Sequence, residues 1–189
     1  MPLPEEHHRF TYEDYQTWPD DERWEILDGK AYNMTPAPTT RHQRIVGNIY
    51  HLLRTMLGGR RGLPGIAPTD VVLSAYDVVQ PDVFVVCDPS KITEKNIQGA
   101  LDLIVEVLSP ATARKDRWEK RALYQRFGVL EYLLVDPDGE YVERYSLGEG
   151  GRYDQGEVFS AEETLTLRSI GHIRIPLSGV FEGESSNHG

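Results

Sequence analysis

The sequence predicts an α/β domain in which helices pack on a mixed β-sheet. Three observations favour this class. Runs rich in Val, Leu and Ile recur at 70–74, 82–87 and 101–108, as in buried strands. Two stretches with helical periodicity alternate with these runs, and two short turn sequences join further strand-like runs as hairpins. We expect one domain over residues 1–182, because single cores of roughly 150 residues and more are common.

The first third is predicted to form a short helix, a hairpin and a long helix. Thr11 stands in an N-cap position before acidic residues, and Pro19 would stop the helix that follows. Asp28-Gly29 joins the runs WEIL and KAYNM, and a two-residue type I′ turn favours such a dipeptide because both central residues need positive φ. Apolar residues spaced by three and four predict a helix over 40–57, namely Ile45, Ile49, Leu52, Leu53 and Met56.

The second half predicts one more helix and another hairpin. A polar loop, DPSKITEKNIQG, separates the runs at 82–87 and 101–108. Pro110 suits the first turn of a helix, and DRWEKRALYQRF keeps helical spacing up to Gly128. EYLLVD and EYVERYSL flank PDG as a hairpin, and shorter strands and loops follow. Residues 183–189 are polar and predict a flexible C-terminal tail.

Charge is distributed unevenly along the chain. The net charge of -10 argues against a protein that coats nucleic acid, because phosphate contacts need Lys and Arg. Residues 41–61, however, carry five basic side chains and no acidic one, and residues 110–127 carry six basic against two acidic. The two runs form either a basic cleft on an acidic body or solvated helix faces without a partner.

Cysteine usage and the N-terminal stretch indicate a cytoplasmic protein. Cys87 is the only cysteine, which excludes an intrachain disulfide framework and suits a reducing compartment. The stretch MPLPEEHHRF lacks the basic and apolar regions of a signal peptide. Apolar runs are too short to span a bilayer, so we expect no membrane partner.

Glu106 lies inside the strand-like run LDLIVEVL. Burying its carboxylate costs several kcal/mol unless it is paired or binds a cation. Strand alternation places Glu106 on the same face as Ile104 and Leu108. Asp82 follows Pro81 at the start of another apolar run, and if the two strands are neighbours the carboxylates meet at one end of the sheet. Close carboxylates repel unless a cation lies between them, and Mg²⁺ accepts such an oxygen-rich pair.

The order Pro81-Asp82, a strand, then Glu106-Val107-Leu108 resembles the PD-(D/E)XK nuclease superfamily. Longer stretches narrow this resemblance: WEILDGKAYNM, HQRIVGNIYHLL, QPDVFVV and LDLIVEVLSPATARKDRWEKRALYQRFGVLEYLLVDP are similar to the Uma-two family of restriction-endonuclease-like proteins, formerly a domain of unknown function. The similarity covers roughly residues 10–180. It implies a restriction-endonuclease-like mixed sheet and a Mg²⁺-dependent endonuclease acting on DNA, with Mn²⁺ as a substitute metal.

The resemblance also implies roles for individual residues. Asp82, Glu106 and the carbonyl of Val107 would be the metal ligands. The superfamily has a lysine two residues after the glutamate, where this chain has Leu108, and Lys120 is the matching lysine in the family. Lys120 would position the attacking water and offset charge in the transition state. On spacing alone, Lys120 is equally an exposed residue in an i, i+4 pair with Asp116.

Further candidates have two interpretations each. Glu25 matches the family's early acidic position and either joins the catalytic site or is a surface glutamate at a strand end. His42 opens the long helix, where backbone amides favour a phosphate, or else lies on a solvated face. The residues expected to bind nucleic acid are His42, Arg41, Arg44, Arg117 and Arg121.

Two other hypotheses stay open. The displaced lysine and the overall acidity suit a catalytically inactive domain that binds a metal, nucleic acid or a protein. In a third hypothesis the fold is a scaffold in which Glu106 pairs with an arginine such as Arg117 or Arg121. If the protein is an active enzyme, a homodimer would suit it, because two symmetric sites cut both strands of a DNA duplex most easily.

Overall fold

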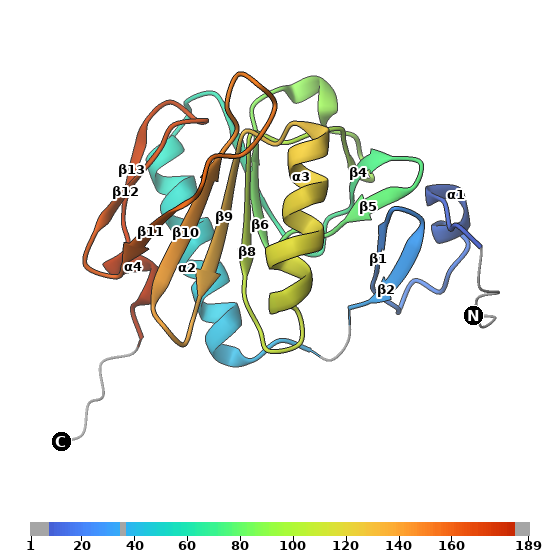
Figure 1. The fold of residues 1–189 in the computed structure, drawn as a ribbon, viewed down its shortest axis with the longest axis horizontal. Coiled ribbons are helices and arrows are strands. Elements are labelled where there is room, and N and C mark those ends of the chain that lie inside the picture. The colour runs from blue at the N-terminus through green and yellow to red at the C-terminus, as the bar shows by residue number, and fades with distance from the viewer. Residues whose placement is uncertain (1–7, 35–36, 184–189) are drawn as a thin grey trace.

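The computed structural model describes residues 8–34 and 37–183 (Figure 1). Its smaller sheet has the strand order β2-β1-β5-β4-β7, and its larger sheet has the order β11-β10-β9-β8-β6-β3. The smaller sheet consists of β1 (Trp24–Leu27), β2 (Lys30–Asn33), β4 (Val71–Ser74), β5 (Asp77–Val79) and β7 (Ile97–Gln98). The larger sheet consists of β3 (Leu63–Ile66), β6 (Val83–Val86), β8 (Leu103–Val107), β9 (Glu131–Asp136), β10 (Tyr141–Ser146) and β11 (Glu157–Ser160).

The remaining elements are short except for one helix. A separate hairpin pairs β12 (Thr164–Leu167) with β13 (Ile173–Pro176). The helical elements are α1 (Tyr12–Tyr15), α2 (Thr40–Leu57), η1 (Pro89–Lys91, a 3-10 turn), η2 (Lys115–Lys120, a π-helix), α3 (Arg121–Phe127) and α4 (Ser178–Phe181). Within the described ranges, no helix combines the length and the apolar composition that crossing a membrane requires.

Local sequence explains the first hairpin and the long helix. Asp28 and Gly29 both have positive φ, 50° and 77°, as a type I′ turn requires, so the predicted hairpin is confirmed. Helix α2 begins after Thr39, whose side chain accepts a hydrogen bond from the backbone of His42, and ends at Gly58 in the left-handed region. The predicted helix over 40–57 is therefore confirmed at both ends.

Two apolar layers enclose the larger sheet. On one face, Val105 and Val107 of β8 pack in the core that also contains α2 residues and the β12–β13 hairpin. On the other face, Ile104 and Leu108 pack with Leu123 of α3 and with strands of the smaller sheet. Helices α2 and α3 lie on opposite sides of the β8–β9 pair, and α1 with β1 and β2 lies at one end of the molecule (Figure 1).

The predicted α/β class with a mixed sheet, flanking helices and additional hairpins is confirmed. Strands β8 and β9 are parallel, whereas β6 and β8 are antiparallel. Both faces of β8 are buried, as its apolar run predicted.

Several boundaries differ from the prediction. The segment expected as a loop between 88 and 99 contains η1 and the two-residue strand β7, which pairs with β4. Helix α1 ends at Tyr15, well before Pro19. The predicted helix up to Gly128 begins as the π-helix η2 before it continues as α3. Of the predicted tail at 183–189, all but Gly183 lies outside the described residues.

Candidate active site

Asp82 and Glu106 lie beside each other at one end of the larger sheet. Strands β6 and β8 are antiparallel with Val83 opposite Val105, so the next pair along the register is Asp82 and Glu106. Asp82 Oδ2 accepts a hydrogen bond from the backbone amide of Val107 at 2.8 Å. Adjacent strands therefore bring two carboxylates that are far apart in sequence to one edge of the sheet.

Lys120 lies between two buried glutamates. Its Nζ is 2.8 Å from Glu106 Oε1 and 2.7 Å from Glu25 Oε1, and it is 3.7 Å from Asp116 Oδ1. Lys120 is only 1% exposed, and Glu25 is fully buried in β1. Neither Lys120 nor Glu25 is therefore a surface residue, and the interpretations that exposed them are wrong. The i, i+4 pair of Lys120 with Asp116 is present.

The π-helix η2 is what turns several charged side chains inward. In a π-helix the backbone bonds run from residue i to i+5, so residues five apart lie on successive turns of one side. Lys115 and Lys120 are five apart, and Lys115 Nζ lies 3.0 Å from Glu25 Oε2 while Lys120 binds the other oxygen. In an α-helix, with 3.6 residues per turn, these two lysines would point in different directions. The wider turn thus lets two ammonium groups share one carboxylate.

Tyr124 completes the surroundings of Glu106. Its hydroxyl donates to Glu106 Oε1 at 2.8 Å, the same oxygen that accepts from Lys120. Among residues 8–34 and 37–183, no side chain or amide donates a hydrogen bond to Glu106 Oε2. Two donors from the helical segment 115–127 therefore hold one oxygen of the Glu106 carboxylate.

His42 belongs to the same site. It is 9% exposed, so the interpretation that it lies on a solvated face is wrong. Its Nε2 lies 3.0 Å from the carbonyl oxygen of Val107 and 3.3 Å from Asp82 Oδ2. This contact holds the first turn of α2 against the end of β8. His42 is also a hydrogen-bonding partner of the Val107 carbonyl.

Comparison with known proteins identifies the family. The Uma2 family model, described as "Putative restriction endonuclease", matches residues 12–178. The chain belongs to this family. A relative from Synechocystis sp. (strain PCC 6803), the "Uncharacterized protein slr1290", is 30% identical over 165 residues, which are 84% of this chain and 85% of that protein.

A crystal structure shares the fold of this Uma2 protein. It comes from Anabaena variabilis ATCC 29413 and is described as a putative nuclease belonging to DUF820. The two structures superpose with a TM-score of 0.75 and 16% sequence identity, covering 91% of this chain and 97% of the other. At this identity the likeness shows the fold alone. Family and fold are therefore those of restriction-endonuclease-like nucleases.

The two buried glutamates of the Uma2 site have opposite pKa shifts. Burial raises the pKa of Glu106 to about 8; Lys120 opposes this shift, and the carboxylates of Asp116, Asp82 and Glu25 reinforce it. Burial also acts to raise the pKa of Glu25, but the charges of Lys120 and Lys115 outweigh it and leave the pKa below its ordinary value. Near neutral pH one glutamate is ionised while the other titrates, a division typical of acid-base sites.

Lys120 and His42 also have shifted pKa values. Burial alone would lower the pKa of Lys120, but Glu106, Glu25 and Asp116 raise it well above its ordinary value. Burial likewise acts to lower the pKa of His42. The hydrogen bond and the charge of Asp82 outweigh burial, so the pKa of the His42 imidazole is raised. Both groups therefore favour their protonated, positively charged forms beside the carboxylates.

Three of the four predicted nucleic-acid-binding arginines lie against residues of the β9–β10 hairpin, and the fourth lies on α2. Arg41 Nη2 pairs with Glu140 Oε1 at 3.0 Å, and Arg44 is exposed on α2. Arg117 pairs with Glu143, and the guanidinium of Arg121 lies over the ring of Tyr145. The hypothesis that Glu106 pairs with Arg117 or Arg121 is wrong, because the cation beside Glu106 is Lys120.

Sequence reasoning missed Lys115 and Tyr124 as members of the site. Tyr124 follows Lys120 by four residues, a spacing that places both side chains on one helix face and could have indicated a shared partner. The five-residue spacing of Lys115 and Lys120 is not an α-helical one, and no sequence signal indicated the π-helix. Asp116 was considered only as a surface partner of Lys120, whereas it is buried.

Proposed function

We propose that this protein is a Mg²⁺-dependent endonuclease that hydrolyses phosphodiester bonds in DNA. Family membership supports phosphodiester hydrolysis in general. The observation that carries the finer proposal is the convergence of Asp82, Glu106 and the Lys120 ammonium at one end of β6 and β8, with 2.8 Å between Lys120 Nζ and Glu106 Oε1. In phosphodiester hydrolysis, two carboxylates can hold a metal ion that activates water, and an ammonium group can offset the negative charge of the transition state.

The donor set fits a hard divalent cation. The cluster contains four carboxylates and two ammonium groups, a formal charge of −2 when all are ionised: Glu25, Asp82, Glu106, Asp116, Lys115 and Lys120. Among the described residues, no three Asp, Glu, His or Cys side chains stand ready as a metal cage. Mg²⁺ suits such a site because it keeps several waters and needs only one or two carboxylates.

Each residue then has a distinct task. Asp82, Glu106 and the Val107 carbonyl would hold the metal, which supplies activation of water and shielding of negative charge. Lys120 would hold the attacking water in line with the phosphorus and offset charge in the transition state. Glu25, bound to both Lys120 and Lys115, would keep the Lys120 ammonium in place.

The first turn of α2 is the proposed phosphate-binding element. His42 is fixed there beside Asp82, and its raised pKa favours a positive imidazolium at the site. Arg41 and Arg44 flank His42 on the same helix. Contacts of these residues with backbone phosphates would make DNA affinity fall steeply as salt rises.

Plasmid nicking with Mg²⁺ or Mn²⁺ tests this proposal. Asp82→Asn and Glu106→Gln are expected to abolish nicking while the protein stays folded, as followed by thermal denaturation. Asp102→Asn is the matched control, because Asp102 Oδ2 accepts from the Cys87 amide at 2.7 Å at the other end of the same two strands. Equal nicking by all the proteins would trace the activity to a contaminant and reject the proposal.

A second candidate function is that of a catalytically inactive metal-binding or interaction domain. One observation favours it: Lys120 pairs with both Glu25 and Glu106 in the protein interior, as a structural ion pair does. Titration calorimetry with Mg²⁺ and Mn²⁺, combined with DNA binding at low salt, separates the two functions. Metal binding without DNA affinity supports the inactive domain, whereas binding of both supports the nuclease.

We further propose a homodimer in the cytoplasm as the active form on duplex DNA. Two symmetric sites would cut the two strands without release of the substrate. Light scattering coupled to size-exclusion chromatography tests this assembly, and a monomer that still linearises plasmid in a single binding event would contradict it.

A further inference from the structure

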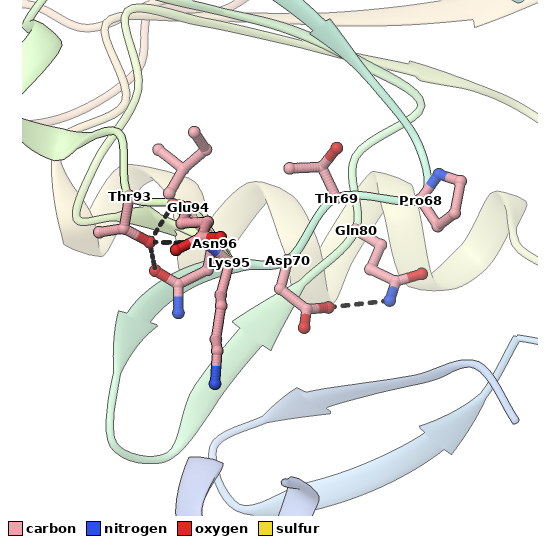
Figure 2. Close-up of a pocket in the computed structure, with 9 residues that line it drawn as sticks. Pro68, Thr69, Asp70, Gln80, Thr93, Glu94, Lys95 and Asn96 are labelled. Carbon is pink, nitrogen blue, oxygen red and sulfur yellow. Dashed lines mark hydrogen bonds between the residues drawn. The ribbon is translucent and has the colours of Figure 1, made fainter. Parts of the chain in front are cut away.

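A polar cavity lies next to the candidate active site. It has a volume of about 380 Å³ and is lined by Pro68, Asp70, Gln80, Glu94, Lys95 and Asn96, among others (Figure 2). This volume falls within the range of small-molecule binding sites. None of its lining residues has a task in the function proposed above.

Gln80 connects the cavity to the active site. Its backbone amide donates to Glu25 Oε1 at 3.0 Å, while its side chain lines the cavity. A second bond attaches the same side of the cavity, because the amide of Ala67, next to Pro68, donates to the carbonyl of Asp82 at 3.1 Å (Figure 2). Gln80 and Asp82 are two residues apart, so their Cα atoms are at most about 7 Å apart. Measured along the axis of a DNA duplex, with a rise of about 3.4 Å per nucleotide, that distance is about two nucleotide steps.

The floor of the cavity is a fixed hydrogen-bond network. Gln80 Nε2 and the Tyr15 hydroxyl both donate to Asp70 Oδ1, at 2.9 and 3.0 Å. Arg23 Nε donates to Gln80 Oε1 at 3.0 Å, so both ends of the Gln80 amide are engaged. Within the part of the chain that the structure describes, no group donates to Asp70 Oδ2. The network therefore holds one carboxylate oxygen as an acceptor for a ligand.

The charges of the lining select the kind of ligand. Asp70 and Glu94 outnumber Lys95, so a phosphate would be repelled. A ligand that donates N–H groups is favoured, and a carboxylate accepts well from the exocyclic amino group of a nucleobase such as cytosine. Thymine presents an acceptor and a methyl group on that edge instead. The chemistry therefore favours amino-bearing bases over thymine.

We propose that this cavity binds a nucleobase carrying an exocyclic amino group, with Asp70 Oδ2 as its acceptor, within two nucleotides of the phosphate at Asp82 and Glu106. The inference rests on the proposed nuclease function, because that function brings the DNA strand to Asp82. It assigns base preference to the cavity, whereas the active site itself contacts only the backbone.

A titration without metal tests the cavity independently of catalysis. Backbone amide NMR shifts are followed while deoxycytidine, deoxyadenosine, deoxyguanosine, thymidine or inorganic phosphate is added. We expect shifts at Asp70, Gln80 and Asn96 with at least one amino-bearing nucleoside, and binding at least about fivefold weaker for thymidine. Asp70→Asn should remove this preference, whereas Asp102→Asn should keep it. The nucleoside comparison on the unmodified protein does not depend on how any variant folds.

Sequencing of the cut ends gives the second readout. If the protein nicks DNA, its ends should be enriched in amino-bearing bases at a fixed position within two nucleotides of the cut, and Asp70→Asn should flatten this bias. Equal binding of thymidine, shifts caused by phosphate alone, or no shift in the cavity would overturn the inference even if nicking is active. Selective nucleoside binding without any nicking would instead reject the nuclease function and leave the cavity as a base-binding site.

Discussion

Lys120 Nζ lies 2.8 Å from Glu106 Oε1, and both side chains are excluded from solvent although they are 14 residues apart in the chain. The superfamily pattern would place a lysine two residues after the glutamate, on the same strand. Here the ammonium group comes from Lys120, the last residue of η2, and it also pairs with Glu25 of β1. The ammonium group beside Glu106 thus comes from a helix and not from the strand that carries the glutamate.

Replacing Lys120 should destabilise the protein strongly. Lys120→Met leaves Glu25 and Glu106 buried without their shared cation, and breaking a buried ion pair in this way costs about 3–5 kcal/mol. Urea denaturation at neutral pH measures the change in the free energy of unfolding. Lys95→Met, at an exposed lysine, is the control and should stay within about 0.5 kcal/mol of the unmodified protein. Equal stability of both variants would mean that the cluster is solvated.

Glu106 should make stability depend on pH. Its pKa in the folded protein is about 8, above the ordinary 4.5. Between these values the folded protein holds a proton that the unfolded chain releases, so the free energy of unfolding falls as the pH rises. The opposite effect of Glu25, whose pKa is lowered, acts below its ordinary value and so outside this window.

Glu106→Gln isolates this effect. Glutamine cannot release the proton, so the variant should gain stability relative to the unmodified protein from about pH 5 to about pH 9. Urea titrations at several pH values in buffers with a chelator give the difference. A difference that is constant over the whole range would show that Glu106 is ionised throughout.

Asp82 should control the protonation of His42. The imidazole Nε2 is 3.3 Å from Asp82 Oδ2, and this contact raises the pKa of His42 against the effect of burial. In Asp82→Asn the charge is lost while the shape is kept, so the pKa of His42 should fall. NMR titration of the imidazole measures it, with Asp102→Asn as the control. An unchanged pKa in Asp82→Asn would place the cause elsewhere.

Tyr124 should act on Glu106 through one hydrogen bond. Tyr124→Phe keeps the ring but removes the donor 2.8 Å from Glu106 Oε1, which costs about 0.5–1.5 kcal/mol at a pH where Glu106 is protonated. Tyr124→Phe should also change the affinity for Mn²⁺ measured by calorimetry, because the Glu106 carboxylate loses the hydroxyl that helps to hold it in position. Tyr153→Phe removes a hydroxyl that donates to the carbonyl of Val129, away from the site. If both variants alter Mn²⁺ affinity alike, Tyr124 has no specific role.

Elements with local causes were predicted well from the sequence. The Asp28-Gly29 turn and helix α2 depend on residues that are neighbours in the chain, namely the positive φ of the turn and the caps at Thr39 and Gly58. The two-residue strand β7 was missed because it depends on pairing with β4, about 25 residues earlier in the chain. The same holds for β3, whose partner is β6.

The sequence by itself determined the fold class, the family resemblance and the positions of Asp82 and Glu106, because strand periodicity and short motifs are written in adjacent residues. Only the tertiary structure decided that Lys120 is buried between two glutamates and that His42 and Lys115 join them. The physical reason is that the burial and pKa of a charged group depend on what surrounds it in space. Those surroundings are assembled from β1, β8, α2 and the π-helix η2, which are distant in the chain.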